Sequence, residues 1–299
     1  MAVCTVVHTE LMSIMSLREV MDRYGIRFKK GLGQNLLLDD NINRIMVEAA
    51  ALSPEDDVVE VGAGLGALTQ RLQRRAGRIL AIEIDRSFMP YLEEQFAEAE
   101  NIELFRGDVL NHPLDKLVSE FIPGGTSYKM VSNLPYYITT PILFHFLESP
   151  VFFRRIVVMV QEEVAQRMSA ATGSRDYGVL AIACRYHAEV DIVHRVPRTC
   201  FAPRPAVDSC VVRLRCRETP LYPDLDGELL LLAVRAGFAQ RRKMLHNSLM
   251  GSQQLAGYRQ YVPEALDAAG IDGTRRPQTL SLDEWAELAR RIQGLAKEK

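Results

Sequence analysis

The 299-residue sequence contains no hydrophobic run near the ~20 residues that a membrane-spanning helix requires, so no membrane span is predicted. Its five cysteines (4, 184, 200, 210 and 216) include no Cys-x-x-Cys pair, and its six histidines include no His-Glu-x-x-His motif. These absences give no support to a disulfide framework or a metal centre. Residues 1–16 lack basic residues before a short apolar run, so no secretory signal is predicted. We expect a cytoplasmic protein with reduced thiols.

Excess positive charge is also absent, because the net charge is −2 and the pI is near 6.3. Three basic clusters nevertheless stand out. The first, 195–217, has six arginines and one acid, Asp208. The others consist of Arg235, Arg241, Arg242 and Lys243, and of Arg27, Lys29 and Lys30. One such cluster is more often solvated surface, but three on an acidic chain favour a basic face for phosphates.

Segments typical of strands and of helices alternate between residues 58 and 160. The expected strands are 58–61, 79–84, 102–105, 129–132 and 156–160. The expected helices are 65–75, 86–99, 114–121 and 141–147. Such alternation predicts an α/β domain with a mostly parallel sheet that is covered on both faces.

The remaining chain predicts three regions. Helices at 161–169 and 177–186 accompany two β-rich runs, 189–193 and 209–216, which can form an antiparallel edge of the sheet. A linker at 219–223 precedes helical patterns at 227–237, 241–250, 262–269 and 282–293. We predict an N-terminal extension with a short amphipathic helix (1–26), an α/β catalytic domain (27–217) and a small helical domain (218–299).

A glycine-rich turn follows the first expected strand, in the segment VVEVGAGLG at 58–66. Glycines let the backbone turn sharply and approach a ligand, and the following helix offers free N–H groups. Gly62, Gly64 and Ala67 also fit the dinucleotide fingerprint, with Glu83 about 20 residues further on. NAD and S-adenosylmethionine both carry an adenosine whose ribose suits such a carboxylate, so this segment alone leaves both open.

Three details favour S-adenosylmethionine. A third glycine, Gly66, completes G-x-G-x-G, the pattern of methyltransferases. Glu60 precedes the loop, where negative charge suits an ammonium and a sulfonium better than a pyrophosphate. Asp108 follows the third strand and can accept a hydrogen bond from the adenine amino group, although a turn or helix cap is an equally common role for such an aspartate.

The run Asn133-Leu134-Pro135-Tyr136 follows the fourth expected strand. An amide side chain and carbonyls around a proline can accept hydrogen bonds from a planar –NH₂ group, and an aromatic ring can stack on the base that carries it. Asn-x-Pro is also ordinary turn chemistry. The position after a strand's carboxyl end, where open α/β sheets bind ligands, is compatible with the first role.

The ordered set of motifs resembles the small-subunit ribosomal RNA adenine N6-dimethyltransferase family. KKGLGQNLL (29–37) is similar to its K-K-x-L-G-Q-N-F-L segment, and FAPRPAVDS (201–209) to its F-x-P-x-P-x-V-D-S. RRKMLHNSL (241–249) is similar to the R-R-K-x-L-x-N-S-L helix of its C-terminal domain. The resemblance implies a Rossmann-like S-adenosylmethionine-dependent methyltransferase that dimethylates two adjacent adenosines in the 3′-terminal hairpin of small-subunit rRNA.

The resemblance also implies roles for single residues. Cofactor contacts are expected from Asn35, Leu37, Gly62, Glu83, Asp108 and Asn133. The target amine is expected to meet Asn133 and the carbonyl of Leu134 or Pro135, while Tyr136 and Phe201 stack on the extruded adenine. Of these two aromatics, Phe201 is expected to be less a core residue, because it lies in a proline-rich loop.

The sequence departs from the family pattern at two informative positions. Leu36 replaces the usual Phe, which affects side-chain packing rather than the backbone contact. Tyr137 stands where other members often have a smaller or polar residue, which predicts a different rim of the base pocket.

Three alternatives remain at this point. They are a large-subunit rRNA adenine methyltransferase of the macrolide-resistance type, a non-catalytic rRNA-binding assembly factor, and an NAD-dependent dehydrogenase, which leaves 133–136 and 201–209 unexplained. We expect a monomer that acts on small-subunit rRNA within an assembling ribosomal subunit.

Overall fold

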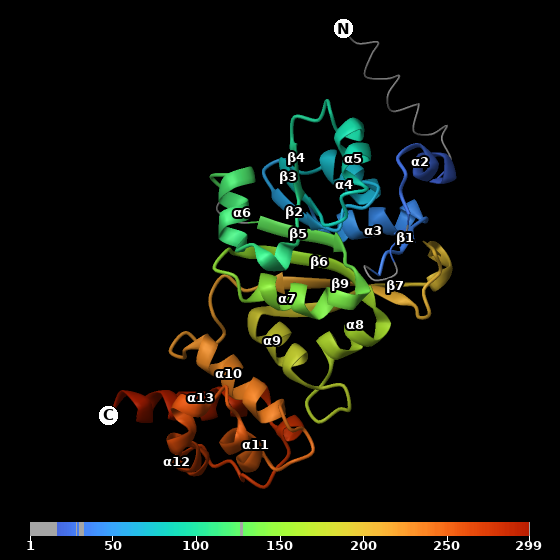
Figure 1. Cartoon of the computed structure of the whole chain (residues 1–299). Coiled ribbons are helices and arrows are strands. Elements are labelled where there is room, and N and C mark those ends of the chain that lie inside the picture. The colour runs from blue at the N-terminus through green and yellow to red at the C-terminus, as the bar shows by residue number, and fades with distance from the viewer. Residues whose placement is uncertain (1–16, 28, 30–32, 126–127, 299) are drawn as a thin grey trace.

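The computed structural model describes residues 17–27, 29, 33–125 and 128–298. Its centre is a seven-stranded sheet in the order β4-β3-β2-β5-β6-β9-β7 (Figure 1). Five strands are parallel: β2 (Asp57–Val61), β3 (Arg78–Glu83), β4 (Ile102–Arg106), β5 (Tyr128–Asn133) and β6 (Phe153–Gln161). β9 (Ser209–Cys216) pairs antiparallel with β6 and with the edge strand β7 (Ala188–Val196). The predicted mostly parallel sheet with an antiparallel edge is confirmed.

Helices cover both faces of this sheet. One face packs against α2 (Leu17–Arg23), α3 (Asp40–Ala50), α4 (Ala67–Gln73) and α5 (Met89–Gln95). The other packs against α6 (Leu114–Phe121), α7 (Thr139–Leu147), α8 (Glu162–Ser169) and α9 (Val179–His187). Neighbouring residues of a strand pack on opposite faces of the sheet, as Val58 and Val59 do. Because both faces are buried, the strands are continuous hydrophobic runs in the sequence. Among the described residues, no helix is long and apolar enough to cross a membrane.

The two N-terminal helices, α2 and α3, differ from the sequence prediction. Residues 11–16 of the expected helix at 11–24 lie outside the described part of the chain, and α2 begins at Leu17. The helix α3 was not predicted, although Asp39 caps it by accepting a hydrogen bond from the Asn41 amide. Its buried face carries Ile42 and Met46 at helical spacing, which was the available signal.

The sheet opens at the carboxyl ends of β2 and β5. Their backbone register covers only three pairs and ends at Val59 opposite Met130, whereas β5 continues along β6 to Asn133 opposite Met159. The buried Ser132 hydroxyl instead accepts a hydrogen bond of 2.9 Å from the Val61 amide. The two strands therefore diverge at the point where the strand order reverses, which is where open α/β sheets form a ligand crevice.

The C-terminal part is helical, with α10 (Gly227–Phe238), α11 (Leu245–Gly251), α12 (Val262–Ala268) and α13 (Leu282–Lys297). The prediction of a helix from 241 is wrong at its start, because Arg241, Arg242 and Lys243 lie on a turn before α11. The Gln240 carbonyl holds this turn, since it accepts hydrogen bonds from the Lys243 amide (2.8 Å) and from the Ser248 hydroxyl (3.1 Å).

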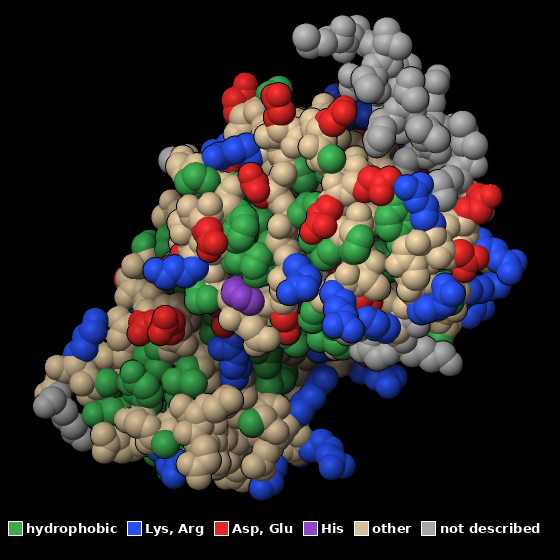
Figure 2. All heavy atoms as spheres, turned by 45° about the horizontal axis from the view of Figure 1, so that its top comes forward, with side chains coloured by type: hydrophobic (Ala, Val, Ile, Leu, Met, Phe, Trp, Pro, Cys, Tyr) green, Lys and Arg blue, Asp and Glu red, His purple; other side chains and the backbone are tan. Residues whose placement is uncertain are grey.

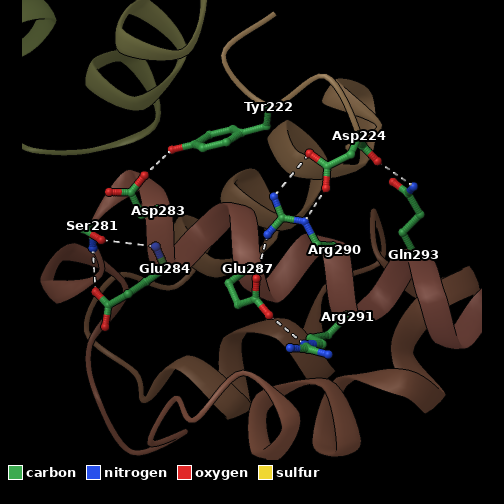
Figure 3. A network of polar contacts seen from close by, with 9 residues as sticks. All are labelled: Tyr222, Asp224, Ser281, Asp283, Glu284, Glu287, Arg290, Arg291 and Gln293. Atoms are coloured by element: carbon green, nitrogen blue, oxygen red, sulfur yellow. Dashed lines mark hydrogen bonds and ion pairs between the residues drawn. The ribbon is translucent and has the colours of Figure 1, made fainter.

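The linker before α10 is tied to α13 (Figure 3). The Tyr222 hydroxyl donates to Asp283 (2.6 Å), and Asp224 pairs with Arg290 (2.7 Å). The helices also share one hydrophobic core with α9, to which Ile182 and Tyr186 contribute. The helical part therefore packs firmly on the α/β part. The predicted boundary at 217 lies between two parts of the chain that share one hydrophobic core.

Glycine 237 allows close packing inside this shared core. A Cβ atom at this position would overlap the buried Trp285 ring. We therefore expect Gly237→Ala to lower the free energy of unfolding by about 1–3 kcal/mol through overpacking, although alanine is the better helix former by ~1 kcal/mol. Gly294→Ala is the matched control in α13, where nothing lies within 4 Å, and it should stabilise slightly. Urea unfolding measures both; stabilisation by both substitutions would contradict the packing argument.

Candidate active site

The crevice between β2 and β5 contains a cavity of about 500 Å³. The cavity brings together nine of the ten predicted site residues from five separate segments of the chain. They are Asn35, Leu37, Gly62, Glu83, Asp108, Asn133, Leu134, Pro135 and Tyr136. The tenth, Phe201, does not line the cavity.

The glycine loop lies directly against the tetrapeptide that follows β5. Gly62, Gly64 and Gly66 all have positive φ angles (81°, 57° and 74°), which other residues rarely adopt. A Cβ atom on Gly62 would meet the Pro135 ring at 3.6 Å and the Asn133 carbonyl at 3.7 Å. Side chains here would fill the crevice, so the glycines leave room for a ligand beside the backbone.

Glu83 is buried at the end of β3 and is held by two backbone amides. Its carboxylate accepts hydrogen bonds from Gly64 N and Asp85 N, both at 2.8 Å. Burial raises the pKa of Glu83. Each carboxylate oxygen keeps further acceptor capacity, as contact with ribose hydroxyls requires.

Asp108 combines a cap with a place in the cavity. It caps a short 3₁₀ helix (Val109–Asn111) by accepting a hydrogen bond of 3.0 Å from Leu110 N, and it also accepts one from the Asn111 amide. The cap role considered from the sequence is confirmed. A carboxylate can accept several hydrogen bonds, so the cap leaves capacity for an adenine amino group.

Glu60 is the most deeply buried carboxylate of the cavity, with 1% of its surface exposed. Its polar partner is the Thr69 hydroxyl, which donates a hydrogen bond of 2.6 Å. Burial raises the pKa of Glu60 to about 8, and the nearby Glu83 carboxylate adds to the rise. A ligand cation beside Glu60 would favour the charged form, so this site suits an ammonium group.

Asp85 anchors the segment that carries Asn35 and was missed from the sequence. It is buried, pairs with Lys29 Nζ at 2.6 Å and accepts a hydrogen bond of 2.8 Å from the Gln34 amide. These contacts and those from Ser87 hold the pKa of Asp85 at about 2 against the effect of burial. In the sequence, the ion pair between Asp85 and Lys29 was indicated only by an acid close to Glu83 and by a basic motif near the N-terminus.

A second anchor joins the segment to a distant part of the chain. β1 (Leu36–Leu37) pairs antiparallel with β8 (Phe201–Ala202), and Leu38 N donates to the Cys200 carbonyl (2.8 Å). The Leu36 side chain comes within 3.5 Å of where a Cβ on Gly64 would lie. Leucine in place of the family's phenylalanine therefore still packs on the glycine loop.

The groups that could accept hydrogen bonds from the target amine differ in how many hydrogen bonds they already accept. The Pro135 carbonyl already accepts hydrogen bonds from the Thr139 hydroxyl (2.9 Å) and Ile138 N (3.3 Å). Within the described residues, neither the Asn133 side chain nor the Leu134 carbonyl has a hydrogen-bond partner. Of the two carbonyls considered from the sequence, that of Leu134 is the one left free.

The two aromatic residues differ from expectation. The Tyr136 hydroxyl shares a hydrogen bond of 2.6 Å with the Ser209 hydroxyl. Its half-buried ring makes a T-shaped contact with the Phe201 ring, with 6.5 Å between centroids. Phe201 is only 4% exposed, so the expectation that it is the less core-like residue is wrong. The pairing of β8 with β1 draws Phe201 into the hydrophobic core beside Val196 and Val211.

Acids from other segments pair with three of the six arginines in the cluster at 195–217. Arg195 pairs with Glu162 (2.9 Å), and Arg213 and Arg215 both pair with Asp191 (2.9 and 2.6 Å). Sequence proximity could not show this, because the acids lie on α8 and β7. The expectation of a strongly basic surface from this segment is therefore reduced.

The sheet order, the glycine loop and the carboxylates after the next two strands define an S-adenosylmethionine-dependent methyltransferase. A family model described as ribosomal RNA adenine dimethylase matches residues 25–293. The chain therefore belongs to the ribosomal RNA adenine dimethylase family, and S-adenosylmethionine is its methyl donor.

Two relatives illustrate the similarity. Ribosomal RNA small subunit methyltransferase A of Pelotomaculum thermopropionicum is 47% identical over 278 residues, which cover 91% of this chain and 94% of that protein. The protein of the same name from Geobacillus thermodenitrificans is 41% identical and covers 96% and 99%.

Solved structures agree on the fold. A dimethyladenosine transferase from Plasmodium falciparum superposes with a TM-score of 0.70 at 23% identity, covering 87% of this chain and 98% of that one. The 23S rRNA methyltransferase ErmE has a TM-score of 0.60 at 30% identity, covering 86% and 99%.

The buried Glu60 predicts a pH-dependent stability. The folded group binds its proton up to about pH 8, whereas the unfolded group releases it near pH 4.5. Folding therefore takes up a proton between these values, and stability falls by up to roughly 1.4 kcal/mol per pH unit as pH rises through them. We expect Glu60→Gln to remove this loss, so that its stability relative to the wild type increases from pH 5 to pH 8. Urea titrations at several pH values measure the difference.

The exposed Glu120→Gln on α6 controls for the loss of one negative charge. Parallel pH profiles of wild type and Glu60→Gln would contradict a buried, protonated Glu60.

Proposed function

We propose that the protein transfers methyl groups from S-adenosylmethionine to the N6 amines of two adjacent adenosines in the 3′-terminal hairpin of small-subunit rRNA. The observation that carries this proposal is the pair of free acceptors, Asn133 and the Leu134 carbonyl, beside a cavity that suits an adenosine ligand. Relatives named ribosomal RNA small subunit methyltransferase A are 41–47% identical over most of the chain, against 30% for ErmE. The higher identity favours small-subunit rRNA as the substrate over large-subunit rRNA, the substrate of the macrolide-resistance type.

The lining of the cavity suits the cofactor, because it combines a glycine loop with the carboxyl groups of Glu60, Glu83 and Asp108. We infer that Glu83 holds the ribose hydroxyls and Asp108 the adenine amine. Gly62, Asn35 and Leu37 would surround the amino-acid end, with the carboxylate of Glu60 behind the glycine loop. Asn133 would lie between cofactor and target.

The target amine needs orientation rather than a base. Its lone pair is delocalised into the adenine ring, which makes it a weak nucleophile. If the Asn133 oxygen and the Leu134 carbonyl accept its two hydrogens, the nitrogen gains sp³ character and its lone pair turns toward the donor. The bound cofactor supplies an electrophilic methyl group on a sulfonium, so positioning and fixed dipoles account for most of the catalysis. The excess proton leaves to solvent after transfer.

Tyr136 is the better supported of the two stacking residues. Its ring lines the cavity and is fixed at the hydroxyl by Ser209, so it can hold an extruded adenine by stacking. The stacking role of Phe201 stays a prediction that requires its ring to leave the core. In its present position Phe201 instead supports Tyr136 through a T-shaped ring contact.

Recognition of rRNA is assigned to the helical domain, 218–299, together with nearby cations. In Figure 2, Lys and Arg side chains gather along the lower right and lower edge of the face, while Asp and Glu are more frequent above. Arg241 is bound to the carbonyls of Ser174 and Arg175, but within the described residues Arg242 and Lys243 have no acidic partner. These two free cations are the best candidates for phosphate contacts.

The setting of the reaction is also a proposal. We infer a cytoplasmic monomer that acts on rRNA within an assembling small subunit, where it can serve as a biogenesis factor. Intact cofactor residues argue against a purely non-catalytic assembly factor.

Methylation mapping tests the function. We expect the wild type to methylate two neighbouring adenosines near the 3′ end of rRNA in undermodified small subunits, as primer extension reports, and not to methylate large subunits. Asn133→Ala should lower transfer by roughly 10²–10³-fold or more, because the amine loses an acceptor that matters in the transition state. Its affinity for S-adenosylhomocysteine should fall far less.

Asn41→Ala, which removes an exposed amide on α3, is the control for this substitution. Near-normal turnover of Asn133→Ala would sink the catalytic assignment, and methylation of large-subunit rRNA would replace the proposed substrate.

Salt dependence tests the RNA surface. The double variant Arg242→Gln/Lys243→Gln should bind rRNA more weakly and flatten the slope of log K against log salt by about 1–2, because up to two phosphate contacts are lost. The matched control is Arg290→Gln/Arg291→Gln, whose arginines lie on α13 and are engaged with Asp224 of the linker and with Glu287 (Figure 3). Equal slopes for wild type and the first variant would exclude these cations from the interface.

A further inference from the structure

The mouth of the cavity carries exposed apolar side chains. Among the exposed large hydrophobic residues that the structure describes, Leu38, Ile84 and Tyr137 line this cavity, and Tyr137 is 47% exposed. Exposed apolar side chains at the mouth of a cavity indicate contact with a ligand. Tyr137 is the aromatic member of this group and directly follows the tetrapeptide.

The neighbouring tyrosines face different parts of the site. Tyr136 is directed to β8 and β9, where it contacts Phe201 and Ser209. The Tyr137 ring lies against Gly33, since a Cβ on that glycine would come within 3.2 Å of its Cδ1 atom. Gly33 has a positive φ of 57° and stands two residues before Asn35. The ring of Tyr137 thus belongs to the side of the cavity formed by the N-terminal segment.

The charges around Tyr137 come from the carboxylates of the adenosine half of the site. Burial raises the pKa of the Tyr137 hydroxyl, and the nearby carboxylates of Asp108 and Glu83 add to the rise. The phenol is therefore protonated at neutral pH and is a hydrogen-bond donor. Both carboxylates are the groups assigned above to the adenosine of the cofactor.

We propose that Tyr137 forms the outer wall of the cofactor site and contacts the adenosine half of S-adenosylmethionine. The inference rests on the proposed placement of the cofactor. It differs from the expectation that this residue alters the rim of the RNA base pocket. The half-exposed ring gains a partner when adenosine binds, and it lines the same cavity as the carboxylates of Asp108 and Glu83.

The proposal distinguishes the two halves of the cofactor. A residue that touches adenosine affects S-adenosylhomocysteine and 5′-methylthioadenosine, which lacks the amino-acid end, by the same factor. A residue that only supports the segment bearing Asn35 affects the complete ligand more strongly. A residue that stacks on RNA affects neither.

The test is a set of dissociation constants for both ligands with the full-length wild type, Tyr137→Ala and Tyr137→Phe. We expect Tyr137→Ala to weaken both ligands equally, by roughly 5- to 50-fold. Tyr137→Phe, which keeps the ring, should lose much less. The KM for small-subunit rRNA at saturating cofactor should not change. Leu221→Ala, which removes an exposed apolar side chain outside this cavity, is the control.

Three outcomes would overturn the proposal. Unchanged dissociation constants with a raised KM for rRNA would assign Tyr137 to the base pocket. Unchanged values throughout would leave it without a role in either site. A loss confined to S-adenosylhomocysteine would make it a support for the N-terminal segment.

Asp108→Ala separates this inference from the cofactor placement. If Asp108→Ala binds both ligands normally, the placement of adenosine fails. If Asp108→Ala weakens both and Tyr137→Ala weakens neither, only the role of Tyr137 fails.

Discussion

The divergence of β2 from β5 is the constraint on which the whole site depends. Backbone pairing between them stops at Val59 and Met130. Beyond this point the Val61 amide has no strand partner on β5, and it donates its hydrogen bond to the Ser132 hydroxyl instead. An unpaired buried amide would be costly, so this hydroxyl lets the sheet open without leaving one. The glycine loop follows one of these strands and Asn133 ends the other, so the cavity assigned to the methyl donor lies at this opening.

The sheet was largely predictable because its strands are continuous hydrophobic runs between turns. The expected 114–121 helix and 209–216 strand match α6 and β9. Elements that depend on distant partners were harder. β1 and β8 are each two residues long and exist only through each other, so Phe201 looked like a loop residue. A helix was predicted at Arg241–Lys243, where the structure has a turn. This turn is held by the hydroxyl of Ser248, which lies on α11 and donates to the Gln240 carbonyl, and the local sequence pattern does not show such a contact.

The site was predictable as a set of residues but not as an arrangement. Motif order indicated which residues meet, while Asp85 and the burial of Glu60 became visible only with the fold. The same holds for charge. Clusters counted along the sequence suggested a basic surface at 195–217, but Glu162 and Asp191 approach from other elements. Burial and ion pairing are properties of the folded chain that a local charge count does not contain.

The pairing of β1 with β8 has a consequence for the newly made chain. One wall of the cavity, with Leu36 and Leu37, is fixed by residues 201 and 202, which are translated much later. Contacts so distant in sequence close late, because the loop between them must be ordered first. A chain still being synthesised therefore has its glycine loop and Asn133 long before it can complete the pocket. Competence to bind the methyl donor arises only after most of the protein has left the ribosome.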